Sequence, residues 1–388
     1  MMIAGVEIQS FTAFGKLEVS LSPRVNVIIG SNGTGKTHLL KAIYALAIAD
    51  QPSSNEERSE KGQESYISNK LLRLFSPEEN KIGTLRARGS TAPTRLSLKG
   101  SDDTGVAISF SGRSKVARLE KNAGPEGHES PPVFIPTKEI LSLVRGMRHP
   151  DHDRATVEMI FDDTYIDLAE LLVRPGFEDE ASGLNEDPRL SSIVRELVGL
   201  VGGRYRWTDD GAFRFEPGSY EEKADPARST SKTAQAYQDS TVLRFDSRRG
   251  QSLSSTMTAE GYRKIGVLHR LLCNGSINPG TTGVLLWDEP EANLNPKLMK
   301  KLVQVLLELS RNGQQIVLAT HDYVILKWLD LLTDKGKEDH VRFHALFRDP
   351  KTEKMALESA DSYSLISKTA ISDTFAELFD EDLARALG

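Results

Sequence analysis

The spacing of apolar residues divides the chain into strands and helices. Residues 3–11 and 15–21 alternate between apolar and polar positions, and residues 25–29 form a continuous apolar run. These periods predict a short antiparallel pair that leads into a buried strand. Three further runs, at 94–100, 105–112 and 114–122, are separated by turn-forming residues and predict a β-meander.

Helical spacing dominates the middle of the chain. Residues 51–65 are polar and predict a surface connection to a helix over 68–76. Apolar residues three and four positions apart predict two further helices, over 159–173 and 191–203. We also expect a hairpin over 204–215 and a loop over 217–240, and the lack of sustained heptads argues against a long coiled coil.

The last third combines buried strands with amphipathic helices. Residues 283–291 and 314–322 each contain an apolar run that ends in polar residues. Between them, residues 297–313 have helical spacing, with Gly313 expected at the helix end. After residue 326 the sequence predicts a helix, a hairpin around 348–354 and an acidic helical end.

Composition narrows the class of protein. The chain has 388 residues, of which 38% are hydrophobic and 27% charged, with a net charge of -6, which favours a soluble chain with a sizeable core. No apolar run reaches the about 18 residues of a membrane span, and the N-terminus lacks the pattern of a signal peptide. We therefore expect a cytoplasmic protein without a membrane partner. The single cysteine, Cys273, excludes an internal disulfide and is predicted to be a buried thiol.

A glycine-rich segment directly follows the first buried strand. Residues 30–37 read GSNGTGKT and precede an apolar helical segment. This order predicts a P-loop, whose backbone N–H groups surround phosphates at a helix N-terminus. Lys36 can then reach the β- and γ-phosphates, and the Thr37 hydroxyl is a candidate Mg²⁺ ligand. The predicted nucleotide-binding residues are Gly30, Ser31, Asn32, Gly33, Thr34, Gly35, Lys36 and Thr37.

Polar side chains also follow the two later buried strands. Asp288 and Glu289 end the first of these runs, and His321 follows the second. Ligands bind at the carboxyl ends of strands in parallel sheets. We therefore predict that Asp288 belongs to the Mg²⁺ shell, that Glu289 orients the attacking water, and that His321 acts in the same catalytic site.

One segment departs from the acidic balance of the chain. Residues 81–121 contain nine Lys or Arg side chains and three acids, a local net charge of +6. This basic segment is a candidate contact for nucleic-acid phosphates, and a solvated strand face is the alternative.

With the P-loop, the DEPE segment at 288–291 and the ATHD segment at 319–322, the chain resembles the ABC-type ATPases of the SMC, RecF and OLD kind. The resemblance covers most of the chain, and the Asn32–Gly33 pair in the P-loop is typical of that group. It implies an α/β P-loop NTPase fold of ABC-ATPase type, with a mixed sheet, an antiparallel β-subdomain and a helical lobe. The implied parts are a nucleotide-binding lobe (1–135), a helical or insert lobe (136–240) and a part with the signature, Walker B, D-loop and H-loop (241–388).

The resemblance also implies a signature motif within residues 256–272. Gly261 takes the place of the signature glycine, at a helix N-terminus that would face phosphate. Ala259 and Glu260 depart from the usual L-S-G-G-Q, which predicts weakened or rearranged contacts to the γ-phosphate. A D-loop is implied at residues 293–295.

Two further features of the family have less definite counterparts. The Q-loop falls at Lys138 and Glu139, where the glutamine is missing and no residue is assigned. Phe11 and Phe14 are candidates for stacking on adenine, with burial in the core as an equal alternative.

The function implied by the resemblance is hydrolysis of ATP with Mg²⁺. The implied ATPase dimerises on ATP and drives or regulates a DNA-directed partner, in phage defence or DNA repair. A nuclease or toxin is the expected effector, and nucleic acid is a candidate partner. The alternatives are the nucleotide-binding subunit of a transporter, disfavoured by the long separation of Lys36 from Gly261, and a low-turnover regulatory sensor, disfavoured by the presence of Glu289.

Overall fold

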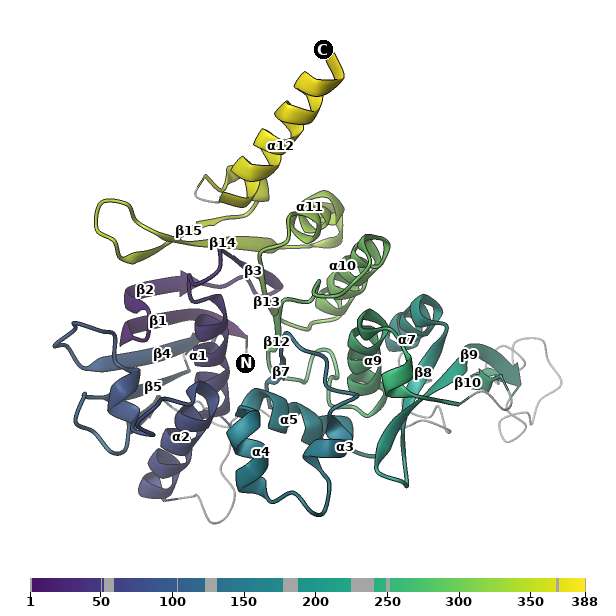
Figure 1. The fold of residues 1–388 in the computed structure, drawn as a ribbon, viewed down its shortest axis with the longest axis horizontal. Helices are drawn as coiled ribbons and strands as arrows, with labels where there is room; N and C mark the ends of the chain where they lie inside the picture. Colours follow the sequence, from purple (N-terminus) through teal and green to yellow (C-terminus); the bar gives the residue numbers. More distant parts are fainter. Residues whose placement is uncertain are drawn as a thin grey trace.

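A six-stranded mixed sheet forms the centre of the protein in the computed structural model (Figure 1). The structure describes residues 2–49, 51, 59–102, 104–122, 131–176, 188–224, 241–248, 252–367 and 370–387. The strand order is β15-β14-β3-β13-β12-β7, parallel from β14 to β7 and antiparallel between β14 and β15. The strands are β3 (Val25–Ile29), β7 (Val133–Ile135), β12 (Leu285–Asp288), β13 (Ile316–Thr320), β14 (Val341–Arg348) and β15 (Met355–Ala360).

Both faces of this sheet are buried, which explains the continuous apolar runs of β3, β12 and β13. On β3, Val27 and Ile29 belong to one apolar cluster, and Ile28 belongs to the other. The first cluster includes side chains of α7 (Pro188–Val201), α9 (Glu260–Cys273), α10 (Pro296–Arg311) and α11 (Tyr323–Leu332), and the second those of α1 (Lys36–Ala49) and α2 (Glu60–Phe75). The two groups of helices therefore cover opposite faces of the sheet, and the carboxyl ends of its parallel strands lie together at one edge.

A second sheet of five antiparallel strands packs beside α1. Its order is β2-β1-β4-β5-β6, so the predicted N-terminal pair and the predicted meander belong to one sheet. Phe11 and Phe14 are fully buried in its core, which settles them as core residues rather than adenine-stacking groups. The strands are β1 (Ile3–Phe11), β2 (Phe14–Ser20), β4 (Thr94–Gly100), β5 (Gly105–Phe110) and β6 (Arg118–Asn122).

The helical lobe lies between the P-loop side and the signature side (Figure 1). The helix predicted over 159–173 is split, because the Asp162 side chain accepts from Thr164 N and starts a new helix. Its helices are α3 (Val144–Met147), α4 (Arg154–Ile160) and α5 (Asp163–Leu172). The chain also has short 3₁₀ turns, η1 (Ile82–Leu85), η2 (Ser255–Met257), η3 (Lys335–Lys337) and η4 (Tyr363–Leu365), and ends in α12 (Ala370–Leu387).

Two predicted connections are shorter than expected. Residues 60–65 are helical, because Ser59 caps the first turn of α2 through Gly62 N. The predicted loop at 217–240 is strand up to Ala224, and residues 225–240 lie outside the described part of the chain. The strands here are β8 (Gly203–Thr208), β9 (Ala212–Ala224), β10 (Thr241–Ser247) and β11 (Leu253–Ser254).

Two predictions from composition can be compared with the structure. Cys273 is buried at the end of α9, and burial raises the pKa of its thiol to about 11, as expected for a structural cysteine. Among the described residues, no helix combines the length and apolar character needed to cross a membrane. The longest described helix, α12, has 18 residues, and no long coiled coil occurs in the described ranges.

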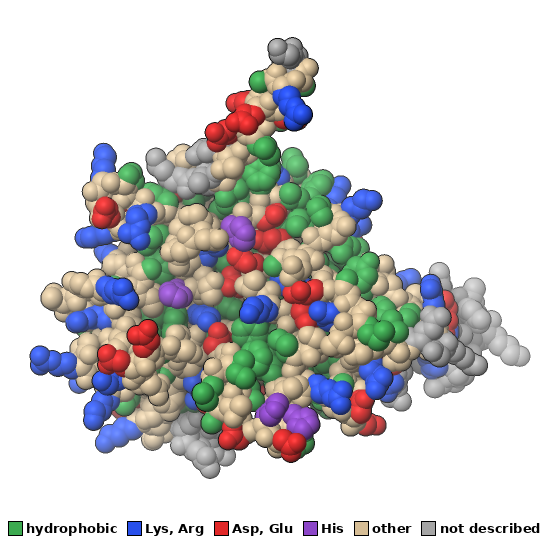
Figure 2. All heavy atoms as spheres, in the orientation of Figure 1, with side chains coloured by type: hydrophobic (Ala, Val, Ile, Leu, Met, Phe, Trp, Pro, Cys, Tyr) green, Lys and Arg blue, Asp and Glu red, His purple; other side chains and the backbone are tan. Residues whose placement is uncertain are grey.

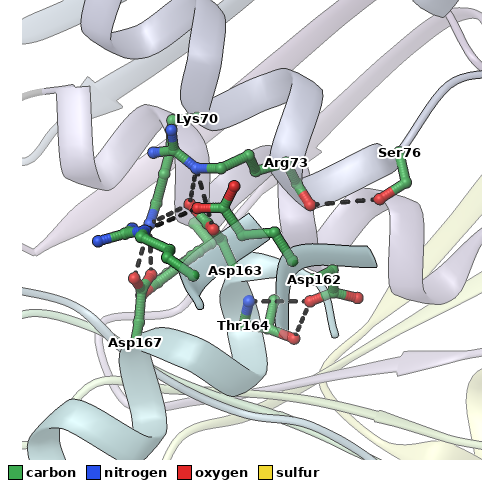
Figure 3. A network of polar contacts seen from close by, with 10 residues as sticks. Lys70, Arg73, Ser76, Asp162, Asp163, Thr164 and Asp167 are labelled. Atoms are coloured by element: carbon green, nitrogen blue, oxygen red, sulfur yellow. Dashed lines mark hydrogen bonds and ion pairs between the residues drawn. The ribbon is translucent and has the colours of Figure 1, made fainter. Parts of the chain in front are cut away.

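A buried charge network joins α5 to α2 and to the P-loop helix (Figure 3). Lys70 Nζ lies 2.7 Å from Asp163 and 2.6 Å from Asp167, and Arg73 Nε lies 2.9 Å from Asp163. From α1, Tyr44 donates a hydrogen bond to Asp167 over 2.7 Å. Because α1 begins at the P-loop, this network fixes the helical lobe to the nucleotide-binding side.

Replacing Lys70 with methionine should lower the free energy of unfolding by about 3 kcal/mol, because Asp163 and Asp167 lose their buried cation. Both Lys70 and Asp163 are almost completely buried. Urea unfolding measures the change. Lys81→Met is the matched control, because its pair with Glu79 is exposed and should contribute nothing measurable. Equal stability of both variants would contradict a structural role for the network.

Candidate nucleotide site

The P-loop connects β3 to α1 and closes around its own lysine. Lys36 Nζ donates to Gly30 O over 2.8 Å and lies 3.3 Å from Ser31 O, and its side chain is buried. Gly35 has a φ of +90°, and a Cβ there would lie 2.8 Å from the Phe14 ring, so only glycine fits. The loop is therefore a tight cradle at the N-terminus of α1, which suits a phosphate group.

Asp288 joins the P-loop helix to the central strands. Its Oδ2 accepts from the Thr37 hydroxyl over 2.7 Å and from Thr137 over 3.2 Å, and Thr137 lies just beyond β7. Its Oδ1 is buried and has no hydrogen-bond partner in the described chain. Burial raises the pKa of Asp288, and the nearby Glu289 raises it further. A cation beside Oδ1 would satisfy this oxygen and favour the ionised carboxylate.

Glu289 adopts a backbone conformation that is unusual for a side-chain-bearing residue. Its φ is +48°, and this turn is held by two bonds, from Glu289 N to Ala319 O over 2.8 Å and from Lys264 Nζ to Glu289 O over 2.8 Å. The Glu289 carboxylate lies 3.0 Å from His321 Nδ1, so the two predicted catalytic side chains meet. Strain of this kind persists only where surrounding contacts determine it, and it is concentrated at functional sites.

The predicted signature residues lie at the N-terminus of α9. Ala259 is the N-cap and is exposed, and no side chain caps the helix. Gly261 is buried against the predicted D-loop, where an added Cβ would lie 2.6 Å from Asn293 O. The uncapped backbone N–H groups at the start of this helix can donate hydrogen bonds to an anion.

Sequence reasoning missed two contributors to this region, Thr137 and Lys264, and placed Glu139 at the Q-loop position without assigning it a role. Thr137 follows a buried strand just as Asp288 does, so the same rule could have identified it. Lys264 is a fully buried lysine, a condition that only the packing of α9 creates. Burial lowers its pKa to about 8. Glu139, at the place of the missing Q-loop glutamine, has its Oε1 2.9 Å from Arg263 Nε and joins the segment after β7 to α9.

The donors present suit Mg²⁺ and a triphosphate. Mg²⁺ binds through one or two protein oxygens together with phosphate and water. Thr37 and Asp288 supply such oxygens beside the cradle. No group of three His, Cys, Asp or Glu side chains in metal-binding geometry occurs in the described ranges, so the site lacks an all-protein metal cage there. Figure 2 shows acidic side chains gathered at the centre of the molecule, where this site lies.

The basic segment 81–121 lies on the five-stranded sheet, where Figure 2 shows Lys and Arg side chains along one edge. Some of its charges are paired on the surface, as in Arg95 with Glu120 and Lys99 with Glu7. Within the described residues, the exposed side chains of Arg113, Lys115 and Arg118 form no ion pair. These three cations remain available for phosphate contacts.

Comparison with known proteins agrees with the site geometry. Residues 1–127 match the family model "AAA ATPase domain", and residues 173–327 match "AAA domain, putative AbiEii toxin, Type IV TA system". The curated relatives include the DNA replication and repair protein RecF of Listeria welshimeri, 31% identical over 150 residues, and that of Bacillus cereus (strain G9842), 41% identical over 149 residues. Both segments of the chain that hold the site, with the P-loop in one and the Asp288–Glu289 and His321 strands in the other, are therefore similar to AAA ATPase domains.

The similarity to these relatives is partial. Each RecF alignment covers 38% of this chain and 34% of the relative, so the chain spans about a third of their length. Similar solved structures include the SmcHead bound to the C-winged helix domain of ScpA, with a TM-score of 0.49 and 13% identity over 94% of this chain and 99% of that one. The SMC head domain from Thermotoga maritima has a TM-score of 0.44 and 13% identity, over 93% and 99%.

Proposed function

We propose that the chain is an ATPase of the SMC/RecF-like group that binds Mg²⁺-ATP at the cradle of residues 30–37 and hydrolyses it. Lys36 contacts the β- and γ-phosphate oxygens, exchanging its bonds to the loop carbonyls for charge-assisted bonds to phosphate. Thr37 and Asp288 hold the Mg²⁺, which neutralises phosphate charge when bound. The observation that carries this proposal is the Thr37–Asp288 contact, with the second Asp288 oxygen left open.

Glu289 is proposed to orient and deprotonate the attacking water. Hydrogen bonds from its backbone to β13 and from Lys264 of α9 fix the position of Glu289. Its carboxylate is therefore held at the carboxyl edge of the sheet, where β13 separates β12 from β3, the strand that leads into the P-loop. His321, 3.0 Å away, positions that carboxylate and can interact with the γ-phosphate. Both groups are partly exposed, which leaves room for water.

Lys36→Ala should weaken ATP affinity by about tenfold to a hundredfold, because a charge-assisted phosphate contact of ~1.5–3 kcal/mol is lost. A fluorescent ATP analogue measures the affinity. Lys41→Ala is the matched control on the same helix, since Lys41 pairs with Asp162 rather than facing the loop. Unchanged affinity in Lys36→Ala would overturn the proposed phosphate site.

We further propose that ATP joins two subunits and that the closed dimer acts on a DNA-directed partner, in repair or phage defence. The uncapped N-terminus of α9 supports the first part, because a second subunit's nucleotide would supply the missing anion. The RecF relatives are named for DNA replication and repair, and one matching family model is named for a putative toxin system. These names favour DNA and a protein effector as partners.

Reversing the three unpaired cations tests the DNA contact. The triple variant Arg113→Glu, Lys115→Glu and Arg118→Glu should bind duplex DNA more weakly for all sequences and reduce the slope of log affinity against log salt by up to ~3. Reversal of Lys81, whose charge is paired with Glu79, is the control. Fluorescence anisotropy at several salt concentrations gives both quantities. An unchanged slope would show that the basic segment is a solvated strand face that does not contact DNA.

A further inference from the structure

The C-terminal helix α12 extends away from the body of the molecule as a single helix (Figure 1). Its base is anchored to α11, where the rings of Tyr323 and Phe375 stack with centroids 4.2 Å apart. From Phe375 at this base outward, four large apolar side chains are partly open to solvent. Phe375, Leu378, Phe379 and Leu383 are 40%, 62%, 67% and 47% exposed.

These side chains form one stripe along α12. Spacings of three and four residues place Phe375, Leu378, Phe379 and Leu383 on a single face of the helix. Asp382 lies on the same face, because it is four residues after Leu378 and three after Phe379. Glu377 lies two residues from both Phe375 and Phe379 and so falls on the opposite face. The stripe therefore combines an apolar surface with one negative charge within it.

A helix of this length needs a covering surface. Isolated helices are marginal in water, and most helical stability in proteins comes from burying an apolar face. Within the described chain, α12 packs against α11 through Phe375 near its base, and the stripe residues of its outer turns, Leu378, Phe379 and Leu383, are left largely exposed. The body of the same subunit does not supply this surface, because the helix points away from it (Figure 1).

We propose that α12 docks in an apolar groove of a protein partner whose rim carries Lys or Arg. The groove buries the stripe, and the basic rim pairs with Asp382. Pairing between the stripes of two copies of α12 is disfavoured, because it would place the Asp382 carboxylate of each copy in the same apolar seam. This inference rests on the proposed function for the existence of an effector, and it assigns the surface that binds it.

The position of α12 also connects the partner to the nucleotide site. The helix that stacks on it, α11, begins two residues after His321, and its N-cap Asp322 accepts from Ile325 N. Tyr323, the first residue of α11, is the residue that contacts Phe375. A movement of the His321 segment during turnover would therefore shift α11, and the contact between Tyr323 and Phe375 would pass that shift to α12.

Site-specific photocrosslinking tests the proposal in the cells that carry this gene. Benzoylphenylalanine at position 379 should give an adduct with one other protein, and the same group at Ala384, on the opposite face, should not. Capture alone does not support the proposal, so the captured protein is purified and its affinity measured. Asp382→Lys should weaken that affinity by about tenfold or more, whereas Glu377→Lys, the matched reversal, should change it less than about twofold.

Several results would overturn the docking surface. They are equal adducts from positions 379 and 384, no adduct at 379, an adduct between two copies of this chain, or equal effects of Asp382→Lys and Glu377→Lys. ATP turnover of Asp382→Lys without the partner should equal that of the wild type, which shows that the variant folds. The proposed nucleotide site is tested separately, by measuring the ATP affinity of Lys36→Ala.

Discussion

Glu289→Gln should lower steady-state ATP hydrolysis by about a hundredfold or more and leave ATP affinity nearly unchanged. A positioned general base contributes ~10²–10⁴-fold, and glutamine cannot accept the proton of the attacking water. The amide preserves the size of the side chain, and the bonds that hold this turn involve the backbone N and O of residue 289. Binding and chemistry should therefore separate in this variant.

The control is the same change two residues further on. Glu291 is buried and accepts from the Thr320 hydroxyl over 2.5 Å, a bond that a glutamine oxygen can keep. Glu291→Gln should therefore reduce turnover much less than Glu289→Gln. Phosphate release and nucleotide affinity are measured on both proteins. Normal turnover in Glu289→Gln would move the catalytic role to another residue.

The central motifs could be predicted because each depends on local sequence. The P-loop needs only a strand, a glycine loop and a helix in succession. Asp288 and His321 could be placed from one rule, that parallel strands end at a common edge of the sheet. Thr137 was missed because β7 has only three residues and the sequence after it lacks the family's glutamine. Lys264 was missed because its burial is produced by tertiary packing, which no local pattern encodes.

Long-range pairing explains the errors in the fold. β1 and β4 pair although they lie about 90 residues apart, so neither sequence segment indicates that they share a sheet. Pro217 and Gly218 predicted a loop but occur inside β9. There, Pro217 is the last partner of β8, and Gly218 is the first partner of β10. These residues mark a change of neighbouring strand rather than the end of a strand, and proline is tolerated at such an interruption.

Two inactive variants should restore each other's ATPase activity when mixed, if each proposed site is built from two subunits. Lys36→Ala removes the phosphate cation but keeps the N-terminus of α9. Ala259→Asp keeps the P-loop, but the new carboxylate accepts hydrogen bonds from the free N–H groups of α9 and repels phosphate. This change should lower turnover by ~10²-fold. Aspartate is a favoured N-cap, so α9 should remain folded. Gly261→Asp is a poorer choice, because its Cβ would displace the Asn293 carbonyl.

The mixture contains one kind of dimer in which an intact P-loop faces an intact signature helix. Phosphate release from an equimolar mixture should therefore exceed the mean of the two separate variants. Ala259→Ser, which restores the hydroxyl usual in this family, is the control and should keep or raise turnover.

Light scattering of Glu289→Gln should show a dimer with Mg²⁺-ATP and a monomer with ADP, since ADP lacks the phosphate that α9 would bind. No gain on mixing, with a monomer under both nucleotide conditions, would refute the two-subunit site. A dimer equally stable without nucleotide would instead place the subunit interface elsewhere on the chain.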